Sequence, residues 1–292
     1  MLGRATSKPL IVPAEPSAFV HRFFVRRVLG PMMRKNWHGV WLCRDGGDDV
    51  MRALAAEARP AIVVMNHHSW WDPLVGMWLA DRYLPGRAGY APMEAGQLAK
   101  FGILKKLGVF GIEPDDAASL PAMVDYLHAR WKAEPSAVLW ITPQGRFADV
   151  RERIVVRPGV SAVAASLDSP LVVSVTSEMV FWTEKKPELL LRLATVQPPE
   201  SPSVAAWQRA ITRGMQANAD ALRDAAVTRD AARFTLIGGS GAASTNVFYD
   251  LWLRLTGRSN RIDMGNRLPA AQRSDASPPT TTSAMRNDQD TR

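Results

Sequence analysis

Short apolar runs alternate with helical patterns along most of this sequence, and this alternation constrains the fold more than any other feature. Strands are predicted at residues 61–66, 87–95, 109–112, 137–141, 170–175 and 189–196. Helices are predicted at 47–58, 73–84, 96–107, 117–133 and 202–226, and Pro158-Gly159 opens another. Strands that alternate with helices are typical of an α/β domain whose mixed, largely parallel sheet is flanked by helices. That is the predicted fold class.

Two polar stretches directly follow predicted strands. The first is Asn66-His67-His68-Ser69-Trp70-Trp71-Asp72, and the second is Thr142-Pro143-Gln144-Gly145-Arg146. In open α/β sheets, ligand sites gather at the carboxyl ends of the strands. We therefore predict that the functional site lies where these two stretches meet.

His67 and Asp72 form a candidate catalytic pair within the first stretch. His67 comes at the end of a predicted strand, and Asp72 stands where the N-cap of the next helix belongs, just before Pro73. A neutral histidine accepts a hydroxyl proton well because its reference pKa is about 6.5, and a carboxylate fixes its tautomer. This pattern predicts a general base that takes the proton of a substrate hydroxyl.

Other interpretations of this stretch stay open. His68 is an alternative base, and His67, His68 and Asp72 together offer three metal ligands, although no second cluster of ligands accompanies them. Asp72 alternatively serves only as a helix cap, a role that is compatible with orienting a histidine. The single cysteine, Cys43, forms no internal disulfide and is expected to be a small buried residue.

The frame Asn66-His67-x-Ser69-x-x-Asp72 resembles the first motif of the glycerolipid acyltransferase family, typified by 1-acylglycerol-3-phosphate acyltransferases. The resemblance extends over about residues 35–200, with apolar Pro170–Val175 similar to the fourth motif. It implies transfer of a fatty acyl chain from acyl-CoA or acyl carrier protein to a lipid hydroxyl, with no resident cofactor and no metal. It also implies substrate contacts for these residues: Asn66, Ser69, Gly108, Pro143, Gln144, Gly145 and Arg146.

The second motif of the family corresponds to residues 108–114 and the third motif to residues 142–146. Both depart from the family pattern. Gly111 stands where the family has an aromatic residue, and Pro114 where it has an arginine; Gln144 replaces a glutamate. In the family, the arginine of the second motif and the residues of the third motif are associated with the phosphate of the acceptor, which suits guanidinium donors. The acceptor is therefore expected to be either lysophosphatidic acid or a glycosylated or other hydroxyl-bearing lipid. Arg151 and Arg153 are alternative phosphate contacts.

Residues 17–42 combine bulky apolar side chains with basic residues and contain no acid. This composition is typical of an amphipathic helix at a membrane interface, and an ordinary packing helix with a solvated basic face is the alternative. Pro31 predicts a helix, a kink and a second short helix. The residues expected to contact the membrane are Phe23, Phe24, Arg26, Arg27 and Trp37.

The net charge of +8 favours an anionic partner. Nucleic acid is disfavoured because the basic residues of 17–42 are mixed with apolar bulk, so we expect an anionic lipid surface. Lys100, Lys105 and Lys106 are candidate contacts for the anionic acyl carrier. No apolar stretch of about 18 residues is present, and the first ten residues lack a secretory signal. A cytoplasmic protein, peripheral on the inner face of the membrane, is expected.

The predicted organisation has a loose N-terminus at 1–16, the interfacial helical segment at 17–42 and the α/β domain at 43–238. A short amphipathic segment at 239–257 and a disordered tail at 258–292 follow. The altered second and third motifs leave one further alternative, a catalytically weak or inactive lipid-binding protein on the same fold.

Overall fold

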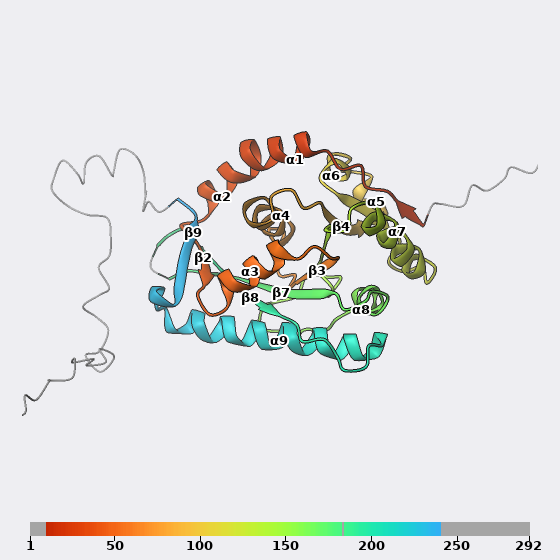
Figure 1. Cartoon of the computed structure of the whole chain (residues 1–292). Helices are drawn as coiled ribbons and strands as arrows, with labels where there is room; N and C mark the ends of the chain where they lie inside the picture. The colour runs from red at the N-terminus through yellow and green to blue at the C-terminus, as the bar shows by residue number, and fades with distance from the viewer. Residues whose placement is uncertain (1–9, 183, 241–292) are drawn as a thin grey trace, which may run out of the picture. The chain divides into compact units, whose positions relative to one another are not determined.

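A nine-stranded mixed sheet forms the centre of the part of the chain that the computed structural model describes, residues 10–182 and 184–240. The strand order is β1-β5-β4-β6-β3-β7-β8-β2-β9 (Figure 1). The strands are β1 (Ile11–Val12), β2 (Gly39–Cys43), β3 (Ala61–Met65), β4 (Gly89–Glu94), β5 (Val109–Ile112), β6 (Val138–Ile141), β7 (Leu171–Val180), β8 (Glu188–Thr195) and β9 (Phe234–Gly238).

The central strands β5, β4, β6, β3 and β7 all run in the same direction. The flanking strands make the sheet mixed: β1 is antiparallel to β5, β8 to β7 and β9 to β2, while β2 and β8 are parallel to each other. The carboxyl ends of β3, β6 and β7 therefore meet at one edge of the sheet. The predicted fold class is confirmed.

Helices cover both faces of the sheet (Figure 1). Successive side chains of β3 point to opposite faces of the sheet. Val63 and Met65 pack with α3 and α4, whereas Ile62 and Val64 pack with α7, α8 and α9. The helices are α1 (Ala18–Phe24), the π-helix η1 (Val25–Leu29), α2 (Gly30–Asn36), α3 (Gly47–Ala56), α4 (Asp72–Tyr83), α5 (Ala95–Leu98), α6 (Ile103–Lys106), α7 (Ser119–Ala133), α8 (Pro158–Ala165), α9 (Val204–Thr228) and the 3₁₀-helix η2 (Ala231–Arg233).

The segment 17–42 is part of the domain, so the predicted boundary at residue 42 is wrong. That boundary falls inside β2, which pairs with β8 and β9. The helices before it bury Val25, Leu29, Met33 and Trp37, a stripe at four-residue spacing that faces the sheet. One side of this segment is therefore core, and only the opposite side is available to a partner.

No break occurs at Pro31. The helical segment continues from α1 through η1 into α2, and Pro31 lies in the first turn of α2. The N–H of Gly30 bonds the carbonyl of Val25, five residues earlier, which widens the turn just before the proline. A π-helical turn thus stands between the two predicted helices.

Three other predictions need correction. Residues 10–16 are ordered against the sheet through β1 and the buried Ala14, so this part of the predicted loose N-terminus is wrong. The predicted helix at 96–107 is two four-residue helices, α5 and α6, since Gly102 interrupts it. The strand β9 was not predicted. Residues 1–9 and 241–292, with most of the proposed amphipathic segment and all of the tail, lie outside the described residues.

Within the described ranges, no helix combines the length and the apolar character that crossing a membrane requires. The longest of them, α9, carries basic and acidic side chains along its exposed side.

Candidate active site

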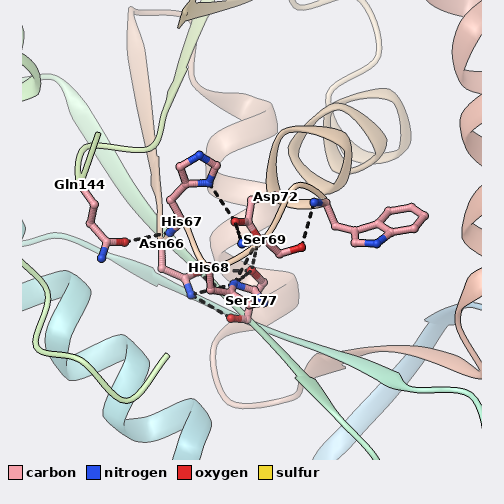
Figure 2. A network of polar contacts seen from close by, with 8 residues as sticks. Asn66, His67, His68, Ser69, Asp72, Gln144 and Ser177 are labelled. Atoms are coloured by element: carbon pink, nitrogen blue, oxygen red, sulfur yellow. Dashed lines mark hydrogen bonds and ion pairs between the residues drawn. The ribbon is translucent and has the colours of Figure 1, made fainter. Parts of the chain in front are cut away.

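His67 and Asp72 meet at the carboxyl end of β3, as the sequence predicts. Nδ1 of His67 lies 3.0 Å from Oδ2 of Asp72 (Figure 2). The Asp72 side chain is 1% exposed and that of His67 is 17% exposed. With its Nδ1–H directed at the carboxylate, His67 keeps Nε2 free to accept a proton, and Figure 2 shows this second nitrogen turned away from Asp72.

The position of Asp72 differs slightly from the prediction. Asp72 is the first residue of α4 rather than the N-cap, and its Oδ2 accepts a hydrogen bond of 2.8 Å from the backbone N–H of Ser69. The carboxylate lies at the amino end of α4, where the helix dipole favours a negative charge. Asp72 therefore stabilises the turn before the helix and faces His67 at the same time.

The second carboxylate oxygen of Asp72 is contacted by two further residues. The hydroxyl of Ser177 donates to Oδ1 at 3.2 Å, and Nδ1 of His68 lies 3.2 Å from the same oxygen. Ser177 comes from β7, the neighbour of β3. Sequence reasoning missed Ser177; the signal that points to it is the register, because Met65 pairs with Val175 and places Ser177 level with His67.

Asn66 ties β3 to β7 at this point. Its Nδ2 donates to the carbonyl of Ser177 at 2.9 Å, and its Oδ1 accepts from the Ser177 N–H at 2.8 Å. The Ser69 hydroxyl accepts from the N–H of Trp71. Both side chains are occupied by contacts within the chain (Figure 2), so their contact with substrate stays a prediction.

His68 faces the interior more than His67 does. Its side chain is 10% exposed, and burial lowers its pKa from the ordinary value of 6.5. Nε2 of His68 is buried and has no hydrogen-bond partner in the described part of the chain. His67 is the more exposed of the two histidines, which agrees with the prediction of His67 as the base. No group of three or more histidine, cysteine or acidic residues among the described ones is arranged to hold a metal ion.

The third-motif loop holds the backbone of His67 from both sides. Oε1 of Gln144 accepts from the His67 N–H at 2.8 Å, and the His67 carbonyl accepts from the N–H of Ala148 at 2.8 Å. The ring of Phe147 lies against the His67 ring with centroids 4.3 Å apart, and Phe147 is 58% exposed. The loop thus fixes His67 and places an aromatic side chain over it, a contact the sequence did not suggest.

Two arginines of this loop, Arg146 and Arg151, are paired with acids of the same loop. Arg146 donates to Glu152 at 2.6 Å, and Arg151 makes two contacts of 2.7 Å with Asp149, which hold the pKa of Asp149 well below its usual range. Gly145 has φ +66, and the side chain of Arg157 lies against it. The N–H of Arg157 also bonds the carbonyl of Pro143.

The second-motif glycines have backbone and packing roles. Gly108 has φ +93, and a Cβ there would lie 2.1 Å from the carbonyl oxygen of Gly89. A Cβ at Gly111 would lie 2.9 Å from Cβ of Val12 in β1. The aromatic residue of the family pattern has no room at Gly111 because β1 pairs with β5 at this position. The predicted substrate contact of Gly108 stays a prediction.

The residues predicted to touch a membrane divide into two groups. Phe23 is 57% exposed, and Arg26 and Arg27 are exposed beside it. Phe24 is partly buried against the core. Trp37 is 1% exposed, and its ring packs edge-on against Trp71 at 5.2 Å, so its predicted membrane contact is wrong.

A histidine–carboxylate pair at the carboxyl ends of parallel strands defines a site for proton transfer in an α/β protein. Comparison with known families shows which family this part of the chain is similar to. Residues 50–177 match the family model described as Acyltransferase, and His67, Asp72, Gln144 and Ser177 all fall within the matched segment. The segment 50–177, which contains the stretch 66–72, is therefore similar to the acyltransferase family, in agreement with the resemblance of that stretch.

Among solved structures, the chain is similar to the crystal structure of the 1-acyl-sn-glycerophosphate (LPA) acyltransferase PlsC from Thermotoga maritima. The TM-score is 0.46 at 13% sequence identity, with 70% of this chain and 79% of that chain covered. No curated protein matches the sequence.

Proposed function

We propose that this acyltransferase moves a fatty acyl chain from an acyl thioester to a hydroxyl group of a lipid, with His67 as general base and Asp72 as its orienting carboxylate. The observation that carries the proposal is the 3.0 Å contact between His67 Nδ1 and Asp72 Oδ2 inside the acyltransferase domain. A partly exposed imidazole on a buried carboxylate is the arrangement that proton transfer at a substrate hydroxyl requires.

The reaction needs no nucleophile from the protein. Nε2 of His67 takes the proton of the acceptor hydroxyl while the oxygen attacks the thioester carbonyl and forms the new C–O bond. Asp72 stabilises the resulting imidazolium through Nδ1. The tetrahedral intermediate then breaks its C–S bond, and the imidazolium returns the proton to the leaving thiolate. The products are the ester and the free thiol of coenzyme A or acyl carrier protein.

The acceptor is either lysophosphatidic acid or a glycosylated or other hydroxyl lipid. The ion pair between Arg146 and Glu152 supports the second class, because Arg146 is already neutralised. Arg157, which lies against Gly145, supports the first, because it is a cation beside the third motif with no ion pair in the described residues. The two classes are separated by direct assay.

The donor is acyl-CoA or acyl-carrier protein, and no resident cofactor is proposed. Of the three lysines considered as carrier contacts, Lys105 and Lys106 both bind the carboxylate of Glu15 and lower its pKa to about 2. Lys100 bonds Gln97 instead. The negative charge of Glu15 therefore offsets one of the three positive charges that these lysines offer to an anionic carrier.

A surface on α1 and η1 is proposed to bind anionic lipid and to hold the protein on the inner face of the membrane. Phe19 is 80% exposed and Phe23 57%, with Arg22, Arg26 and Arg27 beside them. A second exposed apolar pair, Phe101 and Ile103, lies next to the start of α1, since the N–H of Ser17 bonds the carbonyl of Lys106. Apolar and cationic side chains together suit a lipid headgroup region.

The test uses the full chain with radiolabelled palmitoyl-CoA or palmitoyl acyl carrier protein, and with lysophosphatidic acid and a monoglycosyl lipid as acceptors. The wild type should form a labelled ester with one of them. The His67→Ala variant should form none while keeping the circular dichroism and melting curve of the wild type. His128→Ala is the matched control, because His128 lies on α7 and contacts Ser166 outside the site.

Full activity of His67→Ala would overturn the mechanism. A wild-type protein that binds liposomes but turns over no thioester with any acceptor would favour the alternative of an inactive lipid-binding protein. Lipid analysis of cells that lack the protein would then identify the acylated product directly.

A further inference from the structure

Ser177 is a fully buried serine whose hydroxyl faces the catalytic carboxylate. It lies on β7, 105 positions from Asp72 along the chain, and is 0% exposed. Its backbone is fixed independently of its hydroxyl, because Asn66 bonds both its N–H and its carbonyl. The strand ends therefore hold Ser177 in place, and the hydroxyl is left free to interact with the dyad.

Three polar atoms of neighbouring side chains lie close to the hydroxyl of Ser177. Oδ1 of Asp72 is 3.2 Å away, Oδ1 of Asn66 3.3 Å and Nδ1 of His68 3.5 Å. The Asp72 oxygen is the nearest and the only one that carries a charge, and a charged acceptor forms the stronger bond. The Ser177 hydroxyl therefore donates its hydrogen bond to Oδ1 of Asp72.

We propose that Ser177 is a positioning residue that holds Oδ1 of Asp72, turns Oδ2 toward His67, and limits how strongly the carboxylate stabilises the His67 imidazolium. The inference rests on the proposed role of His67 as the base. Asp72 divides its negative charge between the two oxygens: Oδ2 serves His67 and the Ser69 N–H, and Oδ1 serves Ser177 and His68.

Loss of the Ser177 hydroxyl should make the carboxylate a stronger acceptor for His67. With one donor fewer, the negative charge of Asp72 is less neutralised by hydrogen bonds. The carboxylate then stabilises the protonated form of His67 more than the neutral form. The groups that titrate around Asp72 are His67 from the end of β3 and His68 from the same loop. Asp149, in the loop after β6, acts electrostatically on His68. Ser177 donates a hydrogen bond to Asp72 but carries no charge and does not titrate in this range.

The experiment is a histidine titration by NMR on the full chain labelled with ¹⁵N-histidine. The His67 signals are assigned by their loss in His67→Gln. In Ser177→Ala the midpoint of the His67 titration should rise by about half to one pH unit, which corresponds to the net effect of one ordinary hydrogen bond. The acidic limb of kcat/KM should move upward with it.

Ser174→Ala is the matched control. Ser174 is buried on the same strand, and its hydroxyl accepts from Asn218 on the opposite side of the sheet, away from the dyad. This control should leave the His67 midpoint unchanged. Where Ser177→Ala fails to fold, Ser177→Cys keeps the volume with a weaker donor and should give a smaller shift of the same sign.

An unchanged His67 midpoint in both Ser177 variants would overturn the inference, as would an equal shift in Ser174→Ala. The titration does not depend on turnover, so it separates two failures. A wild type that transfers no acyl chain would refute the proposed function, whereas an unmoved midpoint in an active enzyme would refute only the role of Ser177.

Discussion

The backbone N–H of His67 donates a 2.8 Å hydrogen bond to Oε1 of Gln144, and this bond joins the carboxyl ends of β3 and β6. To accept this bond, the side chain at position 144 needs only an oxygen at its end. The glutamate of the family pattern supplies such an oxygen with a negative charge, and Gln144 supplies it without one. The substitution at this position therefore keeps the position of His67 and removes a charge from its surroundings.

Replacement of Gln144 should separate these two effects. Gln144→Glu keeps the acceptor and adds a negative charge, so the protonated His67 is favoured and the acidic limb of the pH–rate profile should move to higher pH. Gln144→Ala leaves the His67 N–H without its partner, and should cost about 1 kcal/mol of stability and about tenfold in kcat. Gln208→Ala, which removes a bond to the carbonyl of Val156 and leaves the His67 N–H paired, is the control for stability. An unshifted profile in Gln144→Glu would contradict the argument.

Phe147 should act as a cover for the base. Its ring lies 4.3 Å from that of His67 although the side chain is 58% exposed, so Phe147→Ala uncovers the imidazole to water. We expect kcat/KM to fall about fivefold and the fraction of thioester lost to hydrolysis to rise, because water then competes with the acceptor hydroxyl. Leu236→Ala, an exposed truncation on the edge strand β9, should change neither. A normal ratio of transfer to hydrolysis in Phe147→Ala would refute this role.

The stability of the fold should fall in mild acid because of His68. Burial lowers the pKa of His68 in the folded chain below the 6.5 of an unperturbed histidine. As the pH falls below 6.5, the unfolded chain binds the proton first, so the free energy of unfolding decreases until the pH reaches the folded pKa. His68→Gln should lose this part of the decrease in urea denaturation at pH 7.5 and pH 5.5. The exposed His128→Gln should keep it, and identical curves for the two variants would contradict the prediction.

The sequence predicts the catalytic pair because the pair is local. His67 and Asp72 are five positions apart across one turn, so a strand end and a helix start suffice to bring them together. Ser177 is 105 positions from Asp72. Its role depends on which strands are neighbours and on their register, and neither follows from the residues of a single strand.

The segment 17–42 shows a second limit of sequence reasoning. Apolar and basic residues alternate there in a way that fits both a membrane helix and a packing helix. The structure divides the aromatic residues: Trp37 is in the core, Phe24 is half-buried, and Phe19 and Phe23 point outward. Composition alone does not distinguish the two sides, because both carry large apolar groups.

The outward residues of this segment should decide binding to lipid. Phe19→Ser with Phe23→Ser removes two exposed rings and leaves the buried stripe of Val25 and Leu29 intact. We expect at least a tenfold loss of binding to vesicles that contain anionic lipid, with an unchanged melting temperature. Val227→Ser, exposed at the end of α9, is a matched control. Equal vesicle pelleting of the double variant and the wild type would refute the membrane surface.

Arg157 and Arg146 should differ in their effect on a phosphate-bearing acceptor. Both lie at the third motif, but Arg146 is held by Glu152 at 2.6 Å, whereas Arg157 lies against Gly145 and has no ion pair in the described residues. A guanidinium already bound to a carboxylate has less to offer a phosphate, since its donors are occupied. The free guanidinium is therefore the better candidate for phosphate recognition.

Arg157→Gln should raise the KM for lysophosphatidic acid by about tenfold or more, the loss expected for one charge-assisted contact, and leave kcat nearly unchanged. Arg146→Gln should change the KM by less than about threefold, because it removes an exposed ion pair of small energy. With a neutral glycosyl lipid as acceptor, neither variant should change the KM. A larger effect of Arg146→Gln would show that Glu152 releases this arginine when substrate binds. Equal losses with both acceptors would show that Arg157 stabilises the loop around Gln144 and does not read the phosphate.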